Sequence, residues 1–142
     1  LGTDGADAPS LLTGAKDAAE GMVFTTHGMP VDEEPKVKEF AALYKEKTGK
    51  DPESAFVYAA PDLVATLEAA VEKAGSLDGQ KLRDALDSLS GVEGTTGEIT
   101  YEGMNRSPLK AVTLVEVKGG KFEFLDQRVP ARELIPPPIK GE

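Results

Sequence analysis

The sequence predicts an α/β fold, and three observations support this prediction. Apolar residues recur at helical spacing over much of residues 9–90, and a β-branched and aromatic run near residue 23 interrupts them. After Gly91 the pattern becomes alternating, as in antiparallel strands. The predicted order is a strand end, a helix, a strand, three helices and then antiparallel strands. This order supplies too few parallel strands for a complete doubly wound sheet, so we expect an incomplete portion of one.

Residues 1–5 resemble the carboxyl end of a buried strand, and we expect the body of that strand to precede this sequence. In α/β proteins, ligands bind beyond the carboxyl ends of parallel strands, which makes the glycine-flanked Asp4 a candidate ligand-binding acid. From spacing alone, a turn or N-cap role for Asp4 is the commoner interpretation. No initiator Met or signal segment is visible, so we expect the chain to be part of a longer protein.

A short helix is predicted over residues 9–20, with Asp7 as its N-cap and Gly21 at its left-handed end. Residues 22–26 are predicted to form the next strand, because β-branched and aromatic residues dominate there. Residues 28–30 are predicted to be a connection. The acids at 32–34 then favour the N-terminal end of a second helix, which would end at residues 48–49.

The second helix carries an apolar stripe of Val37, Phe40, Ala41 and Tyr44. Residues 55–60 are predicted to be a short strand or a tight turn. Pro61 is predicted to open a third helix that Gly75 closes, with the apolar stripe Leu63, Leu67, Ala70, Val71 and Ala74. A fourth helix begins after Ser76 or Asp78 and ends at Gly91, with the stripe Leu82, Ala85, Leu86 and Leu89.

The last third of the chain is predicted to be antiparallel. Strands are expected at 98–101 and 111–117, and the pair Gly119-Gly120 joins 115–118 to 121–124 in a hairpin, since the favoured turns need positive φ. The prolines at 136–138 predict an extended tail that cannot join the centre of a sheet.

Composition excludes several classes of function. The net charge of −9, from 16 basic and 25 acidic residues, argues against binding to nucleic acid or anionic lipid. Without Cys there is no disulfide, thiolate catalysis or Cys-based zinc site. The segment with glycines at 2 and 5 is not followed by the Lys-Ser/Thr pair that a P-loop requires, and the glycines at 94 and 97 favour a turn. Asp4 and Asp7 alone supply too few ligands for a calcium-binding loop.

No catalytic constellation is recognisable. His27 is the one histidine of the chain, and no nucleophile or second ligand accompanies it by spacing, so a hinge residue making a hydrogen bond is the favoured interpretation. Phe56 fits either a core aromatic or the wall of a pocket. We therefore expect no enzyme activity, no metal and no cofactor.

Seven short segments share the order and spacing of one known family across almost the whole chain. They are residues 1–5, 17–22, 40–52, 67–75, 81–86, 94–97 and 117–124. Together they resemble the C-terminal part of the branched-chain amino-acid ABC-transporter binding proteins, of leucine/isoleucine/valine type. One departure is Pro61-Asp62, where the family often has Tyr-Asp.

The resemblance implies a periplasmic binding protein type I-like fold, bilobal with doubly wound parallel sheets and closing by hinge motion. This chain would be an incomplete C-terminal fragment with an antiparallel hairpin. Residues 1–30 would belong to the second lobe, 31–95 to the first, and 96–128 to the second again with the C-terminal hairpin, followed by a Pro-rich tail at 129–142.

The resemblance also implies a ligand site. Asp4 would receive the α-ammonium of an amino acid, the backbone at Gly5 would border it, and Phe56 would pack on the ligand side chain. A charge-assisted hydrogen bond in a closed cleft is a strong specificity element. The groups that hold the ligand carboxylate would lie outside this chain.

The implied function is the extracytoplasmic solute-binding component of an ABC importer. It would bind a branched-chain or similar amino acid, partner permease subunits, and reside in the periplasm or, as a lipoprotein, outside a Gram-positive membrane. The alternative is a ligand-sensing module of the same fold, and an effector domain in the complete gene product would favour it. A third, remote hypothesis is an unrelated enzyme that turns over a bound metabolite. Because incomplete sheets leave apolar faces bare, we also expect a homodimer or a domain swap.

Overall fold

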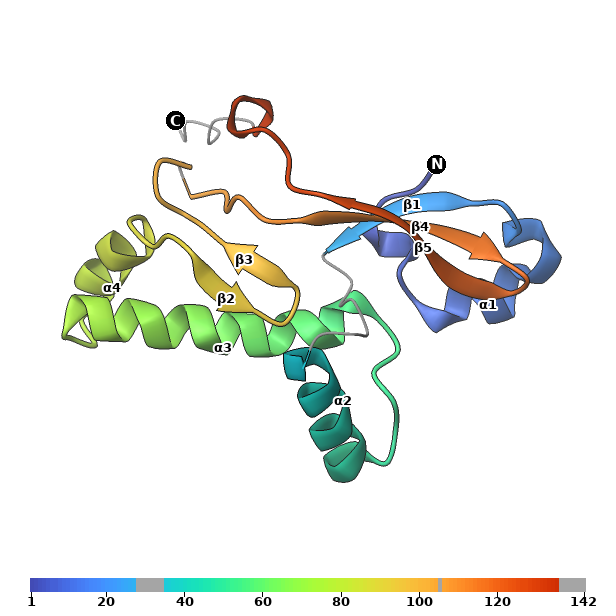
Figure 1. The fold of residues 1–142 in the computed structure, drawn as a ribbon, viewed down its shortest axis with the longest axis horizontal. Helices are drawn as coiled ribbons and strands as arrows, with labels where there is room; N and C mark the ends of the chain where they lie inside the picture. Colours follow the sequence, from blue (N-terminus) through green and yellow to red (C-terminus); the bar gives the residue numbers. More distant parts are fainter. Residues whose placement is uncertain (28–34, 105, 136–142) are drawn as a thin grey trace.

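The structure is a computed structural model that describes residues 1–27, 35–104 and 106–135. Its elements form two groups (Figure 1). One group holds a three-stranded sheet with the N-terminal helical segments, and the other holds three helices with a two-stranded hairpin. The predicted α/β class is confirmed.

The three-stranded sheet has the order β1-β4-β5, with β1 (Val23–His27), β4 (Val112–Lys118) and β5 (Lys121–Arg128) all antiparallel. Gly119 and Gly120 join β4 to β5 with φ of 59° and 71°, as the hairpin prediction required. On the other side of β1, Gly2 forms a parallel bridge with Phe24. The backbone N–H of Gly2 donates to Val23 O at 2.8 Å, and the N–H of Thr25 donates to Gly2 O at 3.2 Å. Gly2 therefore pairs with β1 in parallel through one isolated bridge, whereas Leu1 is fully exposed and the predicted burial is absent there.

A small core lies on one face of this sheet. Phe24, Val115 and Val117 are each 1% exposed, and the ring of Phe122 meets that of Phe24 edge-on at 5.3 Å between centroids. The covering segments are α1 (Pro9–Ala15) and the 3-10 segment η2 (Lys16–Ala19), which contribute Leu11, Leu12, Ala15 and Ala19. The helix predicted over 9–20 is thus divided at Lys16, which has a φ of 49°.

The second helix, α2 (Pro35–Thr48), is present and ends at Gly49 with a φ of 74°, in agreement with the prediction. Of its predicted stripe, Val37 is buried, whereas Phe40, Ala41 and Tyr44 are half-buried. The predicted connection at 28–30 and the acids at 32–34 lie outside the described residues.

The third helix corrects the prediction. α3 runs over Ala55–Ala74, so the strand or turn predicted at 55–60 is wrong and Pro61 lies inside the helix rather than at its start. Gly75 closes the helix with a φ of 56°, as predicted. The early start has a tertiary cause, because the cap comes from Asp7, far away in the sequence.

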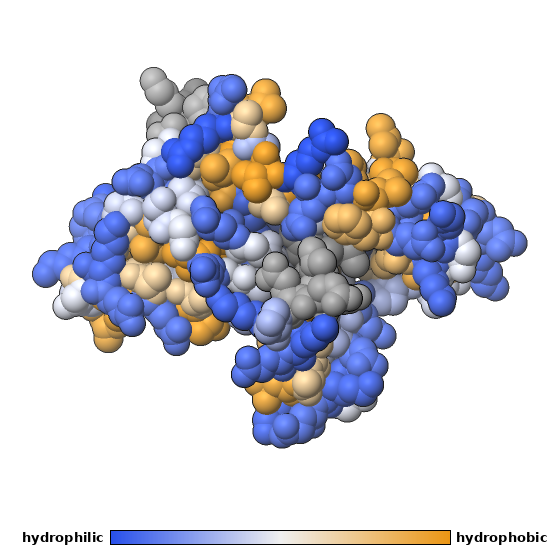
Figure 2. Space-filling view, viewed as in Figure 1, coloured by the Kyte–Doolittle hydropathy of each residue, from blue (hydrophilic) through white to orange (hydrophobic). Residues whose placement is uncertain are grey.

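The buried face of α3 agrees with the predicted stripe only in part: Ala70 is buried and Ala74 packs on the core, whereas Leu63 and Leu67 are exposed. The buried residues are Ala55, Tyr58, Asp62, Thr66 and Ala70. Leu63, Val64 and Leu67 are 63%, 55% and 46% exposed, so much of the apolar face points away from the core. The hairpin and α4 pack on the opposite face, and hydrophobic residues reach the surface beside α3 (Figure 2).

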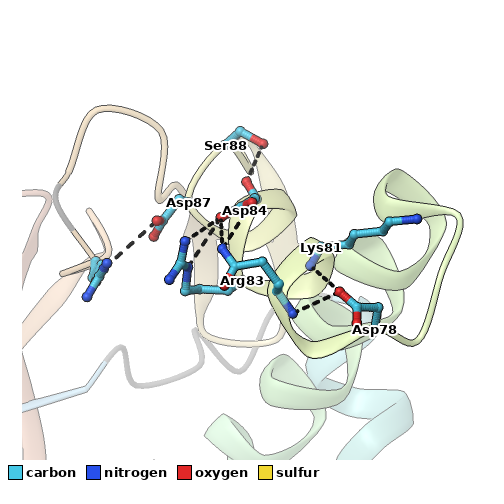
Figure 3. A network of polar contacts seen from close by, with 8 residues as sticks. Asp78, Lys81, Arg83, Asp84, Asp87 and Ser88 are labelled. Atoms are coloured by element: carbon cyan, nitrogen blue, oxygen red, sulfur yellow. Dashed lines mark hydrogen bonds and ion pairs between the residues drawn. The ribbon is translucent and has the colours of Figure 1, made fainter.

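The fourth helix, α4 (Gly79–Leu86), begins where the sequence predicts. Its N-cap Asp78 accepts hydrogen bonds from the backbone N–H groups of Gln80 and Lys81, both at 3.1 Å (Figure 3). Ala85 and Leu89 pack on Ala70 of α3 and form a second core cluster. The helical pattern that was predicted to reach Gly91 stops earlier, at Leu86.

The hairpin of β2 (Val92–Gly94) and β3 (Gly97–Ile99) turns at Thr95-Thr96, which confirms the predicted turn. A short 3-10 segment, η3 (Arg132–Leu134), follows the sheet, and the prolines at 136–138 lie outside the described residues. Of the helices described, none is long and apolar enough to cross a membrane.

Candidate ligand-binding site

The parallel bridge at Gly2 fixes the start of the candidate site. A Cβ at Gly2 would lie 2.6 Å from Cε of Met22 and 3.2 Å from Cβ of Phe24, so a side chain there would require the Met22 side chain to move and would crowd Phe24. The chain then turns through the 3-10 segment η1 (Asp4–Ala6). Asp4 and Gly5 therefore stand directly beyond the carboxyl end of the parallel segment, where α/β folds bind ligands.

His27, the last residue of β1, connects the two predicted side chains of the site. Its Nε2 is 3.5 Å from Oδ2 of Asp4, and its ring meets that of Phe56 edge-on, with 5.2 Å between centroids and 72° between planes. The side chains of His27 and Asp4 are 46% and 51% exposed, and Phe56 is 45% exposed. The three side chains form an open cluster, which we call the Asp4–His27–Phe56 cluster.

Asp7 ties this cluster to the rest of the molecule. It is 5% exposed, and its Oδ2 accepts from Oγ1 of Thr26 at 2.7 Å and from the backbone N–H of Ala55 at 2.9 Å. Asp7 is thus a cap for α3. The prediction that it caps the helix after it is wrong, since the N-cap of α1 is Ala8 and makes no side-chain bond. The bond to Ala55 fixes the position of Phe56 relative to Asp4.

A second group of polar side chains surrounds Asp62 on the buried face of α3. Its carboxylate, 2% exposed, accepts from the backbone and hydroxyl groups of Thr95 and Thr96 and from Nζ of Lys110 at 3.0 Å. Burial by itself raises the pKa of Asp62, but the hydrogen bonds from Thr96, Thr95 and Lys110 and the lysine charge outweigh it and lower the pKa below 3.8. The donors are all supplied by the protein, so this carboxylate fastens the hairpin to α3 rather than binding a ligand.

The acidic residues around α4 are solvated surface groups. Asp84 accepts from Arg83 and Gln80 and is exposed, and Asp87 lies 3.9 Å from Arg106 (Figure 3). In residues 1–27, 35–104 and 106–135, the structure has no group of three or more His, Asp or Glu side chains that could hold a metal ion.

The Asp4–His27–Phe56 cluster has the chemistry to recognise an amino acid. Asp4 offers an accessible carboxylate for a cation, and Phe56 offers an apolar edge beside it. Sequence reasoning selected Asp4, Gly5 and Phe56, but it assigned His27 no part in the site and gave Asp7 the wrong helix. One feature of the sequence could have indicated His27: it directly follows the predicted strand that would neighbour the Asp4 segment.

Comparison with known proteins identifies the family of the chain. A family model described as periplasmic binding protein matches residues 1–121, and the chain belongs to this family. A leucine-binding protein from Thermotoga maritima has 35% sequence identity and a TM-score of 0.78, over 90% of this chain and 36% of that one. The fold is therefore periplasmic binding protein type I-like, and the resemblance to leucine-type binding proteins of ABC transporters is confirmed.

Two further similar structures are complexes with a small molecule. An ABC-transporter substrate-binding protein from Desulfitobacterium hafniense, in complex with Leu, has 25% identity and a TM-score of 0.62 over 75% of this chain and 32% of that one. A solute-binding protein from R. palustris, in complex with benzoate, has 20% identity and a TM-score of 0.64 over 84% and 33%, and shows the fold alone. The chain spans about a third of the length of these structures.

Proposed function

We propose that this chain is part of the solute-binding component of an ABC importer and contributes to a site for a small amino acid, branched-chain or similar. The observation that carries the proposal is the convergence of Asp4 and Phe56 on His27 at the end of β1. These two side chains are far apart in the sequence, and the family resemblance implies a ligand contact for each.

In the proposed complex, Asp4 receives the α-ammonium group and the backbone at Gly5 borders it. Phe56 packs on the apolar side chain of the ligand. The proposal assigns residues 1–30 and 96–128 to one lobe and 31–95 to the other, with a crossing near His27. Closure of the lobes would remove water from Asp4 and strengthen its charge-assisted bond to the ligand.

The family supplies the cellular context of the proposal. The structures from Desulfitobacterium hafniense and R. palustris are binding proteins of ABC transporters, so we propose a binding role without catalysis, a location outside the cytoplasm, and delivery of the ligand to permease subunits. The benzoate-bound relative makes an aromatic acid the competing ligand class. Benzoate has no ammonium group, so its binding would not use the Asp4 carboxylate, whereas the proposed binding of an amino acid depends on it.

Calorimetry on the full-length protein tests this proposal with L-leucine, L-valine, L-alanine and benzoate as probes. We expect an amino acid to bind and Asp4→Asn to weaken its binding by at least about tenfold, as expected for loss of a charge-assisted bond. Asp51→Asn is the matched control, because Asp51 is an exposed carboxylate paired with Lys45 away from the cluster. Binding of benzoate alone, or an unchanged affinity in Asp4→Asn, would refute the proposed role of Asp4.

We also propose that the isolated chain forms a homodimer or a domain swap. The support is the apolar face of α3, where Leu63, Val64 and Leu67 are about half or more exposed. A second copy offers the same face, and a self-complementary contact would remove both from water.

A further inference from the structure

We propose that His27 determines the affinity of the amino-acid site by pairing with Asp4 when no ligand is bound and releasing it when the ligand arrives. This inference rests on the proposed function and adds a residue to its site. It also makes ligand binding depend on pH, because an imidazole changes its charge between about pH 5 and pH 8.

The geometry places His27 where a ligand ammonium would have to compete with it. Nε2 of His27 lies 3.5 Å from Oδ2 of Asp4, within ion-pair distance, and an ammonium bound to the same carboxylate would approach to about 2.7–2.9 Å. The same ring meets that of Phe56 at 5.2 Å between centroids. A ligand that used Asp4 for its ammonium and Phe56 for its side chain would therefore contact or displace this imidazole.

The ionisable groups near His27 leave Asp4 as its partner within the described part of the chain. From η1 and its C-cap come Asp4 and Asp7, and the Oδ2 of Asp7 is already bonded to Thr26 and Ala55. The first turn of α3, which supplies Phe56, contains no acidic residue, and Glu53 before it is exposed.

On the sheet side, Val112 of β4 lies opposite His27, and Arg128 of β5 lies opposite Val112. The Nε of Arg128 is 2.6 Å from Oδ2 of Asp126, so its charge is neutralised locally. Among these groups, Asp4 is thus the carboxylate that pairs with the imidazole of His27.

The direction of the effect follows from charge. When His27 is protonated, it is a cation 3.5 Å from the carboxylate, so it both occupies Asp4 and repels an incoming ammonium. When His27 is neutral, Asp4 keeps its full charge for the ligand and the imidazole remains beside it as a hydrogen-bonding group. Ligand affinity should therefore be higher at pH 8 than at pH 5.5, about the two ends of the imidazole range.

The test is calorimetry on the full-length wild-type protein and on His27→Gln and His27→Phe, with L-leucine, L-valine and L-alanine as probes. For the wild type we expect affinity to fall about twofold to fivefold from about pH 8 to pH 5.5, the effect of one partly exposed ion pair. Both variants should lose this pH dependence. His27→Phe retains an aromatic ring against Phe56, so it separates loss of charge from loss of packing.

Lys121→Gln is the matched control, because it removes one positive charge at the exposed start of β5, beyond the Gly119-Gly120 turn, and should keep the wild-type pH profile. If the wild type binds an amino acid and His27→Gln shows the same pH profile, the inference about His27 is overturned while the proposed function stands. If no probe binds the wild type at either pH, the proposed function fails and the inference fails with it.

Discussion

Asp7 accepts a hydrogen bond at 2.9 Å from the backbone N–H of Ala55, the first residue of α3. The bond joins the segment that carries Asp4 to the helix that carries Phe56. The same Oδ2 accepts from Oγ1 of Thr26, next to His27 in β1. One buried carboxylate thus sets the relative positions of the three members of the Asp4–His27–Phe56 cluster.

The first prediction concerns this carboxylate. Asp7→Ala removes the cap of α3 and leaves the Thr26 hydroxyl and the Ala55 N–H without their acceptor. We expect the free energy of unfolding, measured by urea denaturation, to fall by about 2–4 kcal/mol, from the loss of a helix cap and of a buried acceptor. Asp17→Ala, at an exposed carboxylate on η2, is the control and should stay within about 0.5 kcal/mol of wild type. Equal stability of the two variants would contradict the assigned role of Asp7.

The second prediction concerns Asp62 and acid. Because hydrogen bonds from Thr96, Thr95 and Lys110 outweigh burial and hold the pKa of Asp62 below 3.8, its contribution to stability is complete above that value. The contribution is lost as the pH falls through the lower pKa of the folded state. Asp62→Asn should therefore be less stable at neutral pH and lose less stability than wild type as the pH is lowered from about 5 to about 2. Urea denaturation at a series of pH values measures both effects, and parallel pH profiles would contradict this assignment.

The sequence predicted local features well and tertiary ones less well. Periodicity located α2, α4 and the hairpin of β4 and β5, because each has its own cap, glycine or alternating pattern. The start of α3 was wrong because Pro61 resembles a first-turn residue, whereas the cap that extends the helix back to Ala55 comes from Asp7. A local sequence pattern cannot reveal a contact between residues that lie so far apart in the chain.

The same reason explains what was missed in the candidate site. Asp4 and Phe56 could be selected because the family resemblance covers both. His27 becomes significant only when the fold brings it between them, since its own neighbours in the sequence suggest no chemistry. The N-terminal half of the α3 stripe was misassigned because Asp62 is polar, and the donors at Thr95, Thr96 and Lys110 make its burial favourable.

The third prediction concerns Gly94, at the end of β2. A Cβ there would lie 2.5 Å from Cγ of Asp62, so Gly94→Ala must push the hairpin away from α3 and weaken the bonds of that carboxylate. We expect a loss of about 1–3 kcal/mol in the free energy of unfolding, as for overpacking in a filled interior. Gly79→Ala is the matched control, because a Cβ at Gly79 would have no neighbour within 4 Å and the residue lies in helix α4. A Gly94→Ala variant as stable as the Gly79→Ala variant would contradict the close packing of Gly94 on Asp62.

The fourth prediction concerns the exposed apolar face of α3. If this face mediates association of the isolated chain, replacing a large apolar residue at its centre with a charged one should shift the chain towards monomer. Leu67→Lys is the variant of choice, since Leu67 is 46% exposed and the buried face of the helix lies on the Tyr58, Thr66 and Ala70 side. Light scattering coupled to size exclusion should give a dimer for the wild-type chain and a monomer for Leu67→Lys, because a lysine at a self-complementary contact places like charges together.

Leu77→Lys provides the control for this experiment. Leu77 is 80% exposed but lies between α3 and α4, outside the face formed by Leu63, Val64 and Leu67, so the same substitution should leave the dimer intact. Two outcomes would count against the α3 face: a wild-type chain that is monomeric at all concentrations, or a Leu67→Lys chain that remains dimeric. The second outcome would move the contact to another exposed apolar surface, such as Phe124 and Leu125 on β5, which are 53% and 47% exposed.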